Sequence, residues 1–322
     1  MKSVTLISIE IAMLILQFVS NSLLVVTHTT TNINTDEVAL LSLKAHVTDT
    51  GNVISSHWSV STPVCNWLGV TCKIRHGRVA TLNLRNFGLV GTIPSHLGNL
   101  SFLEHLDLSN NTLHGNIPKE LARLRRLNYL NLRFNYLDGD MPGWLGSLAK
   151  LRHLGLTSNK LSGSLPVELS NLTMLKAINL GNNLLKGNVP QQWGISFGNL
   201  KYLNIDDNKL TGQFPLPILN MSSLIFVSFT NNSLSGPFPL NICHSLPNLK
   251  GLYLSINNLN GRRPSSIKLC SKLQDLSISV NKLSGPIPGE IWNLTTLRTL
   301  YLGYNNLKAQ LLYTHQNSKM KG

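Results

Sequence analysis

The chain has 322 residues and a formal net charge of +14 at neutral pH, from 28 Lys and Arg against 14 Asp and Glu. Hydrophobic residues make up 42% of the chain, which excludes an intrinsically disordered protein. Aromatic residues are 7% and there is no long basic run, so we expect no nucleic-acid partner and interpret the charge as a general attraction to anionic partners or surfaces.

Residues 1–30 are expected to be a signal peptide. Lys2 gives a short positive start, and an apolar run follows from Ile11 to Val19. Glu10 and the polar residues 20–22 interrupt the stretch, whereas a membrane-spanning helix needs about 20 nearly continuous apolar residues. The alternative is an uncleaved N-terminal anchor. A signal peptide places the mature chain in a compartment where disulfides and N-glycans form.

Residues 31–78 are expected to cap the first coil of the repeats, whose leucine edge would otherwise be exposed. The segment 35–47 predicts an amphipathic helix. One predicted face holds Val38, Leu41 and Ala45. Beside it lie Leu40, Leu43 and Val47.

A repeat of 24 or 25 residues, running from residue 79 to residue 312, determines the fold. Each copy follows L-x-x-L-x-L-x-x-N, except that Phe87 replaces the asparagine in the first copy. The asparagines of the later copies are Asn111, Asn135, Asn159, Asn183, Asn208, Asn232, Asn257, Asn281 and Asn305. This pattern predicts leucine-rich repeats. We therefore expect an α/β-type repeat solenoid of about ten coils, with short parallel strands on the concave face and a degenerate last coil.

Each position of the repeat has a structural reason. Leu106 and Leu108 alternate with Asp107, so both leucines point into the core from one strand. The amide of the repeat asparagine is expected to bond backbone groups of its own turn and of the neighbouring coil. Gly115 allows a backbone conformation that other residues avoid, and Pro118 fixes φ in a segment on the convex side.

Four cysteines allow three pairings. Cys65 and Cys72 lie within the cap and are the natural first pair, with a stabilisation of about 2–3 kcal/mol. Cys243 and Cys270 lie one coil plus two residues apart. They are either a second disulfide on the convex side or two small buried hydrophobic residues.

Several segments resemble a known family. "LDLSNNTLHGNIPKELARL" (Leu106 to Leu124) resembles the plant-type leucine-rich repeat. "W…CNWLGVTC" (Trp58, Cys65 to Cys72) resembles the N-terminal cap of plant receptor-like kinases and receptor-like proteins. "ICHSLPNLKGLYLSINNLNG" is similar to the subfamily that includes the flagellin and elongation-factor receptors. The resemblance covers about residues 35–307 and implies a receptor ectodomain with a helical, disulfide-bonded cap.

The C-terminal end departs from this family. Ala309 replaces the glycine of the last copy, and residues 313–322 form a polar tail without a cap. We expect that the chain is truncated before the transmembrane helix and kinase of such receptors. The last coil would then have an uncovered edge, which is unfavourable for stability and solubility.

The repeat register predicts a ligand-binding surface. The residue before the first inward leucine of each strand projects onto the concave sheet, and aligned apolar residues there form a patch. This column and its neighbours supply the expected ligand contacts, which are Tyr129, Arg133, Phe134, Arg152, His153, Tyr202, Asp206, Phe226 and Tyr253. The alternative is that the aromatic rings stack laterally and only stabilise the sheet.

N-x-S/T sequons predict N-glycosylation of a secreted chain. They are Asn99, Asn110, Asn171, Asn220, Asn231 and Asn293. Asn110 and Asn231 are expected to border the concave face, and the other four lie in the convex segment.

No catalytic motif is present, and the histidines lack metal-ligand spacing, so we predict no enzyme activity, cofactor or metal site. The resemblance implies an extracellular module that binds a peptide or protein on its concave face, in defence or peptide signalling. A co-receptor and an anionic cell-wall polysaccharide are further candidate partners. The location is the extracellular space, or the outer face of the plasma membrane if the parent is a full receptor. The alternatives are a secreted inhibitor of cell-wall-degrading enzymes, similar to polygalacturonase-inhibiting proteins, and a non-functional truncated product.

Overall fold

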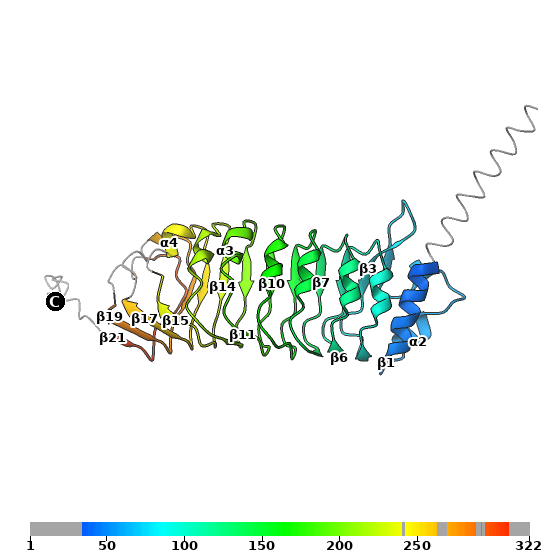
Figure 1. Cartoon of the computed structure of the whole chain (residues 1–322), viewed down its shortest axis with the longest axis horizontal. Helices are drawn as coiled ribbons and strands as arrows, with labels where there is room; N and C mark the ends of the chain where they lie inside the picture. Colours follow the sequence, from blue (N-terminus) through cyan, green and yellow to red (C-terminus); the bar gives the residue numbers. More distant parts are fainter. Residues whose placement is uncertain (1–33, 240–241, 263–268, 288–290, 292–293, 309–322) are drawn as a thin grey trace, which may run out of the picture.

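The computed structural model describes residues 34–239, 242–262, 269–287, 291 and 294–308, which form one elongated, curved solenoid (Figure 1). The expected signal peptide, Asn293 and the polar tail 313–322 lie outside the described residues. Successive coils stack along the long axis, so the chain has one continuous leucine core.

An 11-stranded sheet lines the concave side. The strands in spatial order are β2 (Val70–Cys72), β3 (Val79–Asn83), β5 (His105–Asp107), β7 (Tyr129–Asn131), β9 (His153–Gly155), β10 (Ala177–Asn179), β12 (Tyr202–Asn204), β14 (Phe226–Ser228), β16 (Gly251–Tyr253), β18 (Asp275–Ser277) and β20 (Thr299–Tyr301). All pair in parallel except β2, which is antiparallel to β3. The predicted fold class is therefore confirmed.

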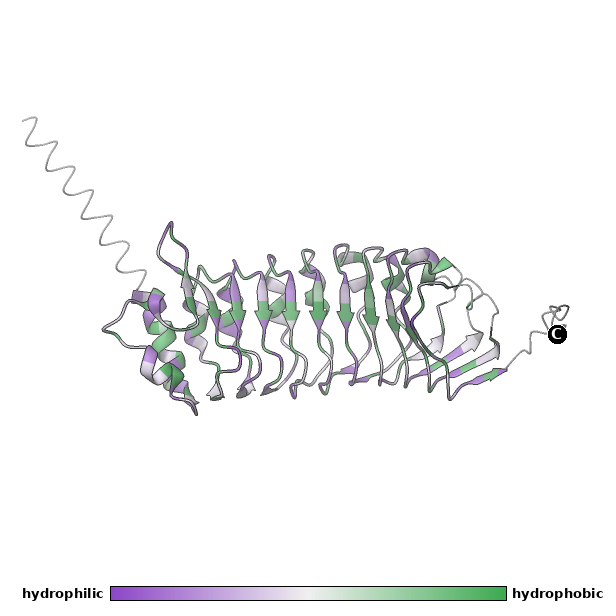
Figure 2. Cartoon of the chain, turned by 180° about the vertical axis from the view of Figure 1, so that it is seen from behind, coloured by the Kyte–Doolittle hydropathy of each residue, from purple (hydrophilic) through white to green (hydrophobic). Residues whose placement is uncertain are grey.

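The strands form because leucines at alternating positions can all enter one core. Leu106 and Leu108 are completely buried, and the equivalent leucines of the next coil, Leu130 and Leu132, are buried equally. Figure 2 shows the resulting hydrophobic band across the strands of the concave sheet. Each of these leucines contributes about 1.5–3 kcal/mol of burial free energy.

A second set of short strands forms on the opposite edge of most coils. One sheet joins β1 (Val47–Asp49), β4 (Leu89–Thr92), β6 (Thr112–Asn116) and β8 (Tyr136–Asp138). The next sheet joins β11 (Lys186–Gly187) and β13 (Lys209–Leu210). The last joins β15 (Ser235–Pro237), β17 (Asn258–Arg262), β19 (Lys282–Pro286) and β21 (Asn306–Lys308). The sequence predicted only an extended segment here, and it did not indicate this lateral pairing.

Short helices complete the convex side of the coils. They are η2 (Ser95–Asn99), η3 (Lys119–Arg123), η4 (Gly143–Ser147), η5 (Val167–Asn171), α3 (Trp193–Ser196), η6 (Leu216–Asn220) and α4 (Ile242–Ser245). Pro118 stands directly before η3, where its fixed φ of −63° suits a helix start. Gly115 has a φ of +76°, which confirms the predicted need for glycine in the segment before it.

The cap closes both sets of strands at the N-terminal end. A helix over 34–46 leads into β1, which pairs antiparallel with β4, while α2 (Val53–His57) and η1 (Val64–Asn66) lead to β2. Trp58 and Trp67 stack in the cap with ring centroids 5.2 Å apart. The predicted Cys65–Cys72 disulfide is present.

The predicted helix is confirmed, but its predicted apolar face is partly wrong. Val38 is 52% exposed, and Ala45 is exposed as well, whereas Ala39, Leu40 and Leu43 are fully buried. The buried face also contains Asp36, at a spacing of three to four residues from Ala39 and Leu40. Because this polar residue lies on the buried face, the apolar residues alone indicated the wrong face of the helix.

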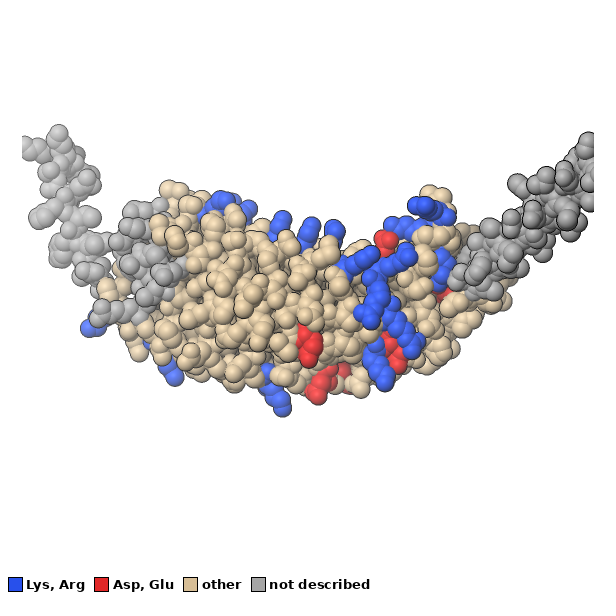
Figure 3. All heavy atoms as spheres, turned by 45° about the horizontal axis from the view of Figure 1, so that its top comes forward, with Lys and Arg blue, Asp and Glu red and all other residues tan. Residues whose placement is uncertain are grey.

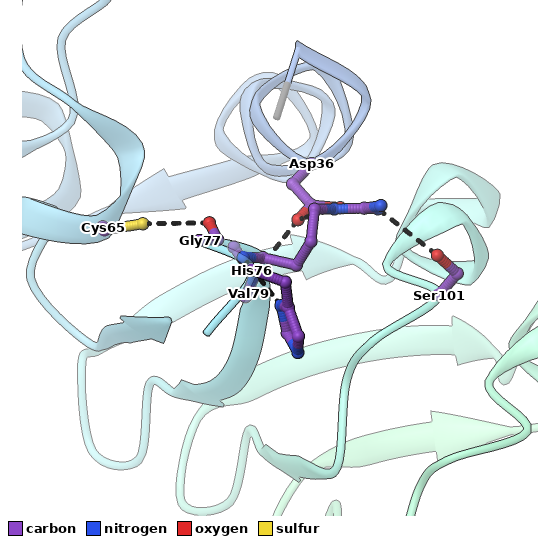
Figure 4. A network of polar contacts seen from close by, with 7 residues as sticks. Asp36, Cys65, His76, Gly77, Val79 and Ser101 are labelled. Carbon is purple, nitrogen blue, oxygen red and sulfur yellow. Dashed lines mark hydrogen bonds and ion pairs between the residues drawn. The ribbon is translucent and has the colours of Figure 1, made fainter. Parts of the chain in front are cut away.

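Asp36 joins the cap helix to the first coil (Figure 4). Its carboxylate accepts hydrogen bonds from Arg78 Nε at 2.8 Å, from Arg78 Nη2 at 2.6 Å and from the backbone N–H of Val79 at 3.0 Å. Both side chains of the ion pair are buried. Arg78 also donates to the Ser101 hydroxyl and lies over the ring of Phe102. Because both carboxylate oxygens accept hydrogen bonds from the residues that lead into the first coil, this pair fixes the orientation of the cap.

The repeat asparagines clamp adjacent coils together. Asn135 Nδ2 donates to the carbonyl of Leu132 in its own coil and to that of Leu108 in the preceding coil. Its Oδ1 accepts from the N–H of Leu113, also in the preceding coil. The same contacts recur down the chain, which confirms the predicted role of the amide. We call the nine asparagines, Asn111 to Asn305, the asparagine ladder.

The second cysteine pair is also a disulfide. Cys243 belongs to α4 and bonds Cys270 of the next coil, and both residues are buried. It ties two successive coils together in a region where the neighbouring residues 263–268 lie outside the described part.

We predict that Asp36→Asn destabilises the fold by about 3 kcal/mol, because it leaves the buried Arg78 charge without its counter-ion. Urea unfolding would measure the loss. The matched control is Glu104→Gln, which breaks the partly exposed Lys73–Glu104 pair and should cost less than about 1 kcal/mol. Equal, small losses in both variants would show that the buried pair does not hold the cap.

Candidate ligand-binding face

Lateral pairing of the concave strands aligns one residue from every coil. We call this set the entry column, because its members precede the first inward leucine of each strand. The column runs Thr81, His105, Tyr129, His153, Ala177, Tyr202, Phe226, Gly251, Asp275 and Thr299. This is the register that the sequence predicted.

Three rings of the entry column stack on one another. His105 and Tyr129 lie nearly parallel with centroids 4.1 Å apart, and Tyr129 and His153 are tilted at 5.6 Å. The lateral stacking considered as an alternative to ligand contact is therefore real in this part of the sheet. It does not hide the rings completely, because His153 remains exposed.

Burial lowers the pKa of both histidines of this stack. The pKa of His105 is below its ordinary value of 6.5 because of burial, partly offset by the carboxylate of Asp107. The pKa of His153 is lowered by burial first and then by the positive charges of Lys176, Arg152 and His105. Both shifts favour the neutral form of the ring, which suits stacking and hydrogen bonding.

A small hollow opens beside this stack. Tyr129, Arg133 and His153 border it, together with Gly155 and Ala177, and its volume is about 100 Å³. The hollow exists because Gly155 and Ala177 have little or no side chain between larger neighbours. It is large enough for one small side chain, so three of the predicted contact residues share one depression.

Phe134 occupies an unusual backbone position. Its φ is +55°, in the left-handed region that Asn tolerates and Phe rarely adopts. The ring is 51% exposed, and the Arg133 guanidinium lies 5.8 Å from its centroid. Phe134 and Arg133 border another hollow together with Arg85 and Ser109. The equivalent residues of the other coils also have a positive φ, so the repeat backbone holds this exposed ring on the surface.

A second aromatic group lies further along the sheet. Phe226 and Tyr253 pack with centroids 4.9 Å apart, and Tyr202 pairs laterally with Phe226 and is 49% exposed. Gly251 makes this packing possible, because a Cβ there would lie 2.8 Å from the Tyr253 ring and 2.9 Å from the Phe226 ring. Ala177 separates this group from the ring stack at Tyr129.

Asp206 and Arg152 lie at opposite edges of the face. Asp206 follows β12, and its pKa is raised, chiefly by burial and then by the neighbouring Asp207 carboxylate. Arg152 precedes β9 and borders a rim hollow with Lys150 and Arg126. The nine predicted residues thus occupy one face, in two aromatic groups with charged edges.

One polar network on this face was missed by the sequence analysis. Asp107 is buried, and it accepts hydrogen bonds from the Ser109 hydroxyl at 2.6 Å and from Asn131 Nδ2 at 2.9 Å. Asn131 also donates to the Tyr129 hydroxyl at 3.4 Å. The sequence signal that could have predicted this network is the residue between the two leucines of each strand, such as Asp107 or Asn131. It lies two positions after the entry-column residue, so its side chain is on the same face of the sheet.

The described sequons fall on two surfaces. Asn99, Asn171 and Asn220 end the convex helices η2, η5 and η6, whereas Asn110 and Asn231 follow concave strands with positive φ. Asn110 and Asn231 donate to Asn86 and Asp207 of the preceding coils. Within the described residues, no His, Cys, Asp and Glu side chains are grouped to hold a metal ion. The same part of the chain contains no helix long and apolar enough to cross a membrane.

Family models match most of this architecture. A leucine-rich repeat N-terminal domain matches residues 33–73, a leucine-rich repeat region matches 70–192, and further leucine-rich repeats match 199–221 and 247–307. Capped solenoids of parallel strands with this repeat form the class of leucine-rich-repeat proteins.

The known proteins that this chain resembles are plant leucine-rich-repeat proteins. The chain is 47% identical over 75 residues to the LRR receptor-like serine/threonine-protein kinase EFR of Arabidopsis thaliana, which is 23% of this chain and 7% of that kinase. The ectodomain of the Arabidopsis thaliana receptor kinase GASSHO1/SCHENGEN3, solved in complex with CASPARIAN STRIP INTEGRITY FACTOR 2, superposes with a TM-score of 0.79 at 35% identity. That match covers 84% of this chain and 33% of the ectodomain.

A plant ice-binding protein superposes with a TM-score of 0.75 at 30% identity, over 85% of this chain and 87% of that protein. Other similar structures are plant receptor ectodomains in complex with peptide hormones. The chain belongs to the plant leucine-rich-repeat family and has the fold of its receptor-kinase ectodomains. It spans only a small part of the receptor kinases that it matches.

The positive charge beside His153 gives a testable consequence. We predict that Lys176→Glu raises the pKa of His153, because it replaces a charge that disfavours protonation, and changes the pKa of His105 less. NMR titration of the two rings would measure this. Equal shifts in both histidines, or none, would contradict the local field described here.

The same pKa values set a direction for stability. The folded state favours the neutral form of His105 and His153. Their contribution to the stability of the fold is therefore complete above the ordinary pKa of 6.5 and is lost as the pH falls below it.

Proposed function

We propose that the concave face binds an extended peptide or protein segment, as the recognition module of a receptor-like kinase or receptor-like protein. The observation that carries the proposal is the register of the entry column, which presents half-exposed aromatic and charged side chains on consecutive parallel strands. Coils stack about 4.8 Å apart and an extended peptide advances about 3.3 Å per residue, so each coil would meet one or two peptide residues.

The two aromatic groups would have different roles. Tyr129, Arg133 and His153 surround the hollow of about 100 Å³, which suits one small anchoring side chain. Tyr202, Phe226 and Tyr253 offer a broader apolar surface, whereas the exposed ring of Phe134 lies beside Arg133 of the first group. Tyr and Arg are enriched among residues that dominate binding energy, because they combine apolar area with polar groups. Asp206 and Arg152 would select the charge of the ligand at each edge.

Support for a signalling role comes from the relatives. EFR is a receptor-like kinase, and the GASSHO1/SCHENGEN3 ectodomain is solved with a bound factor. By analogy, this chain would act outside the cell, in defence or peptide perception, and a co-receptor would contact the free edge of the bound complex. N-glycans on Asn99, Asn171 and Asn220 would cover the convex helices and leave the central concave face open.

The test is selection of random 12-residue peptides displayed on phage against the full chain. We predict that enriched peptides lose about tenfold or more in affinity for Tyr202→Ala, because interface tyrosines are frequent hot spots. The matched control is Tyr136→Ala, which removes an equally exposed tyrosine from β8 outside the concave sheet. It should change the affinity less than about twofold. Enriched peptides that bind both variants as tightly as the unmodified chain would refute the concave site.

Ice binding is a second candidate, because the chain spans most of the length of the plant ice-binding protein that it resembles. The two candidates differ in what they require. Ice binding predicts thermal hysteresis of the chain without any peptide, whereas the proposed recognition function predicts none.

A further inference from the structure

A line of basic side chains borders the concave face at the edge where the chain enters the strands. The residue just before the entry column is basic and exposed in five coils, and these residues are Arg152, Lys176, Lys201, Lys250 and Arg298. We call them the basic rim. Figure 3 shows Lys and Arg side chains along the upper rim of the solenoid, where few acidic side chains are visible.

Backbone hydrogen bonds hold the rim residues in register. The N–H of Lys176 donates to the carbonyl of Arg152 at 2.8 Å, and the N–H of Lys201 donates to that of Lys176 at 2.9 Å. The N–H of Arg298 is bonded in the same way to Gln274, the rim position of the coil before it. Neighbouring rim positions are therefore one coil apart, about 4.8 Å. Arg152, Lys201, Lys250 and Arg298 follow one another at two-coil intervals, and the positions between them hold Lys176, Ile225 and Gln274.

The rim charges are not neutralised by the protein. In the described part of the chain, the ion pairs are Lys73–Glu104 and Arg78–Asp36, and neither includes a rim residue. Like charges one coil apart repel each other, so this arrangement does not stabilise the fold. Their field extends onto the concave face, because Lys176 and Arg152 both contribute to the lowered pKa of His153.

We propose that the basic rim binds a linear acidic polysaccharide built of hexuronate units. Such a polymer has one carboxylate on every sugar ring. Successive 1,4-linked rings turn over, so the carboxylates on one side of the polymer repeat every two rings, a length close to that of two coils, about 9.6 Å. An extended acidic peptide fits less well, since side chains on one side of it repeat every two residues, about 6.6 Å. Single-stranded nucleic acid binds to aromatic platforms, and the rim positions carry none.

The rim shares Arg152 with the edge of the peptide site proposed above, and its other members lie outside that site. Its members precede the entry column, and at Arg152 the rim borders a hollow that Lys150, Arg126 and Glu104 also line. A polymer on the rim would leave Tyr202 and Phe226 free. The two proposals can therefore fail independently.

Binding of the full chain to de-esterified oligogalacturonate, measured by titration calorimetry, tests the rim. We expect binding that weakens about tenfold or more when the salt concentration rises from about 50 mM to about 500 mM. The variant Lys176→Glu, Lys201→Glu, Lys250→Glu should lose about tenfold or more in affinity. If this variant does not fold, as judged by circular dichroism, the corresponding Gln variant replaces it.

The matched control reverses three exposed lysines in strands of the second set. Lys186→Glu, Lys209→Glu, Lys282→Glu makes the same change in net charge in β11, β13 and β19. It should change the affinity less than about twofold if the rim is the site. Tyr202→Ala should leave oligogalacturonate binding unchanged, so a failure of the peptide site would not affect this result.

Three outcomes would overturn the proposal. Equal losses in the rim and control variants would mean that net charge alone attracts the polymer. Tighter binding to poly-glutamate or to phosphatidylserine vesicles than to oligogalacturonate would assign the rim to an acidic protein or to a membrane. Equal binding to fully methyl-esterified oligogalacturonate would show that the carboxylates are not recognised.

Discussion

The asparagine ladder is the interaction on which the rest of the structure depends. Each ladder amide donates to a carbonyl of its own coil and to one of the preceding coil, and it accepts from a backbone N–H of that preceding coil. The groups that it pairs are buried, and leaving one of them unsatisfied would cost about 1–3 kcal/mol. The ladder therefore fixes both the turn after each strand and the distance to the next coil. A leucine core alone would permit sliding between coils, because apolar contacts have no direction.

Because the spacing between coils is fixed, residues at the same position of successive repeats lie in a line on the surface. The entry column and the position before it, which is basic in five coils, are adjacent in sequence, yet they form two parallel lines with different chemistry. One line carries rings and small residues on the concave face, as at Tyr129, Ala177 and Gly251. The other carries repeated positive charge at the edge, as at Lys176 and Lys201. Because both lines follow the same curve, a chain-like ligand could lie along either of them without distorting the solenoid.

The features that could be predicted from the sequence are those that repeat. With ten copies of one pattern, an exception in a single copy does not change the predicted structure. The concave strands, the ladder contacts and the register of Tyr202 with Phe226 therefore agree with the prediction. The cap does not repeat, and there the inward Asp36 made Leu40 and Leu43 look less central than they are. The pairing of Asp36 with Arg78 joins residues 42 positions apart, which no local pattern encodes.

Two further features required the backbone. The residue before each ladder asparagine has a positive φ, from Asn110 to Tyr304, and so does Asn86 before Phe87. Several of these residues are asparagines, which tolerate that conformation, so the sequence did not indicate that the conformation is required in each coil. Phe134 and Ile256 break the residue preference but keep the conformation, so their exposure follows from the fold rather than from their hydropathy. The strands of the second set could not be predicted from residue type either. Their pairing, like that of isolated bridges such as Asp140 with Ser162, depends on the spacing of the coils and not on strand-forming residues.

Hydrogen–deuterium exchange of Asn183→Ala tests the ladder most directly. Asn183 bonds Leu156 and Leu161 of the preceding coil and Leu180 of its own. We predict that segments containing Leu161, β9 and β10 exchange about tenfold faster in this variant, while the cap strands are unchanged. Asn188→Ala, which removes an exposed amide without a ladder contact, should leave exchange as in the unmodified chain. Unchanged protection around Leu161 in Asn183→Ala would mean that the leucine core, and not the ladder, sets the spacing of the coils.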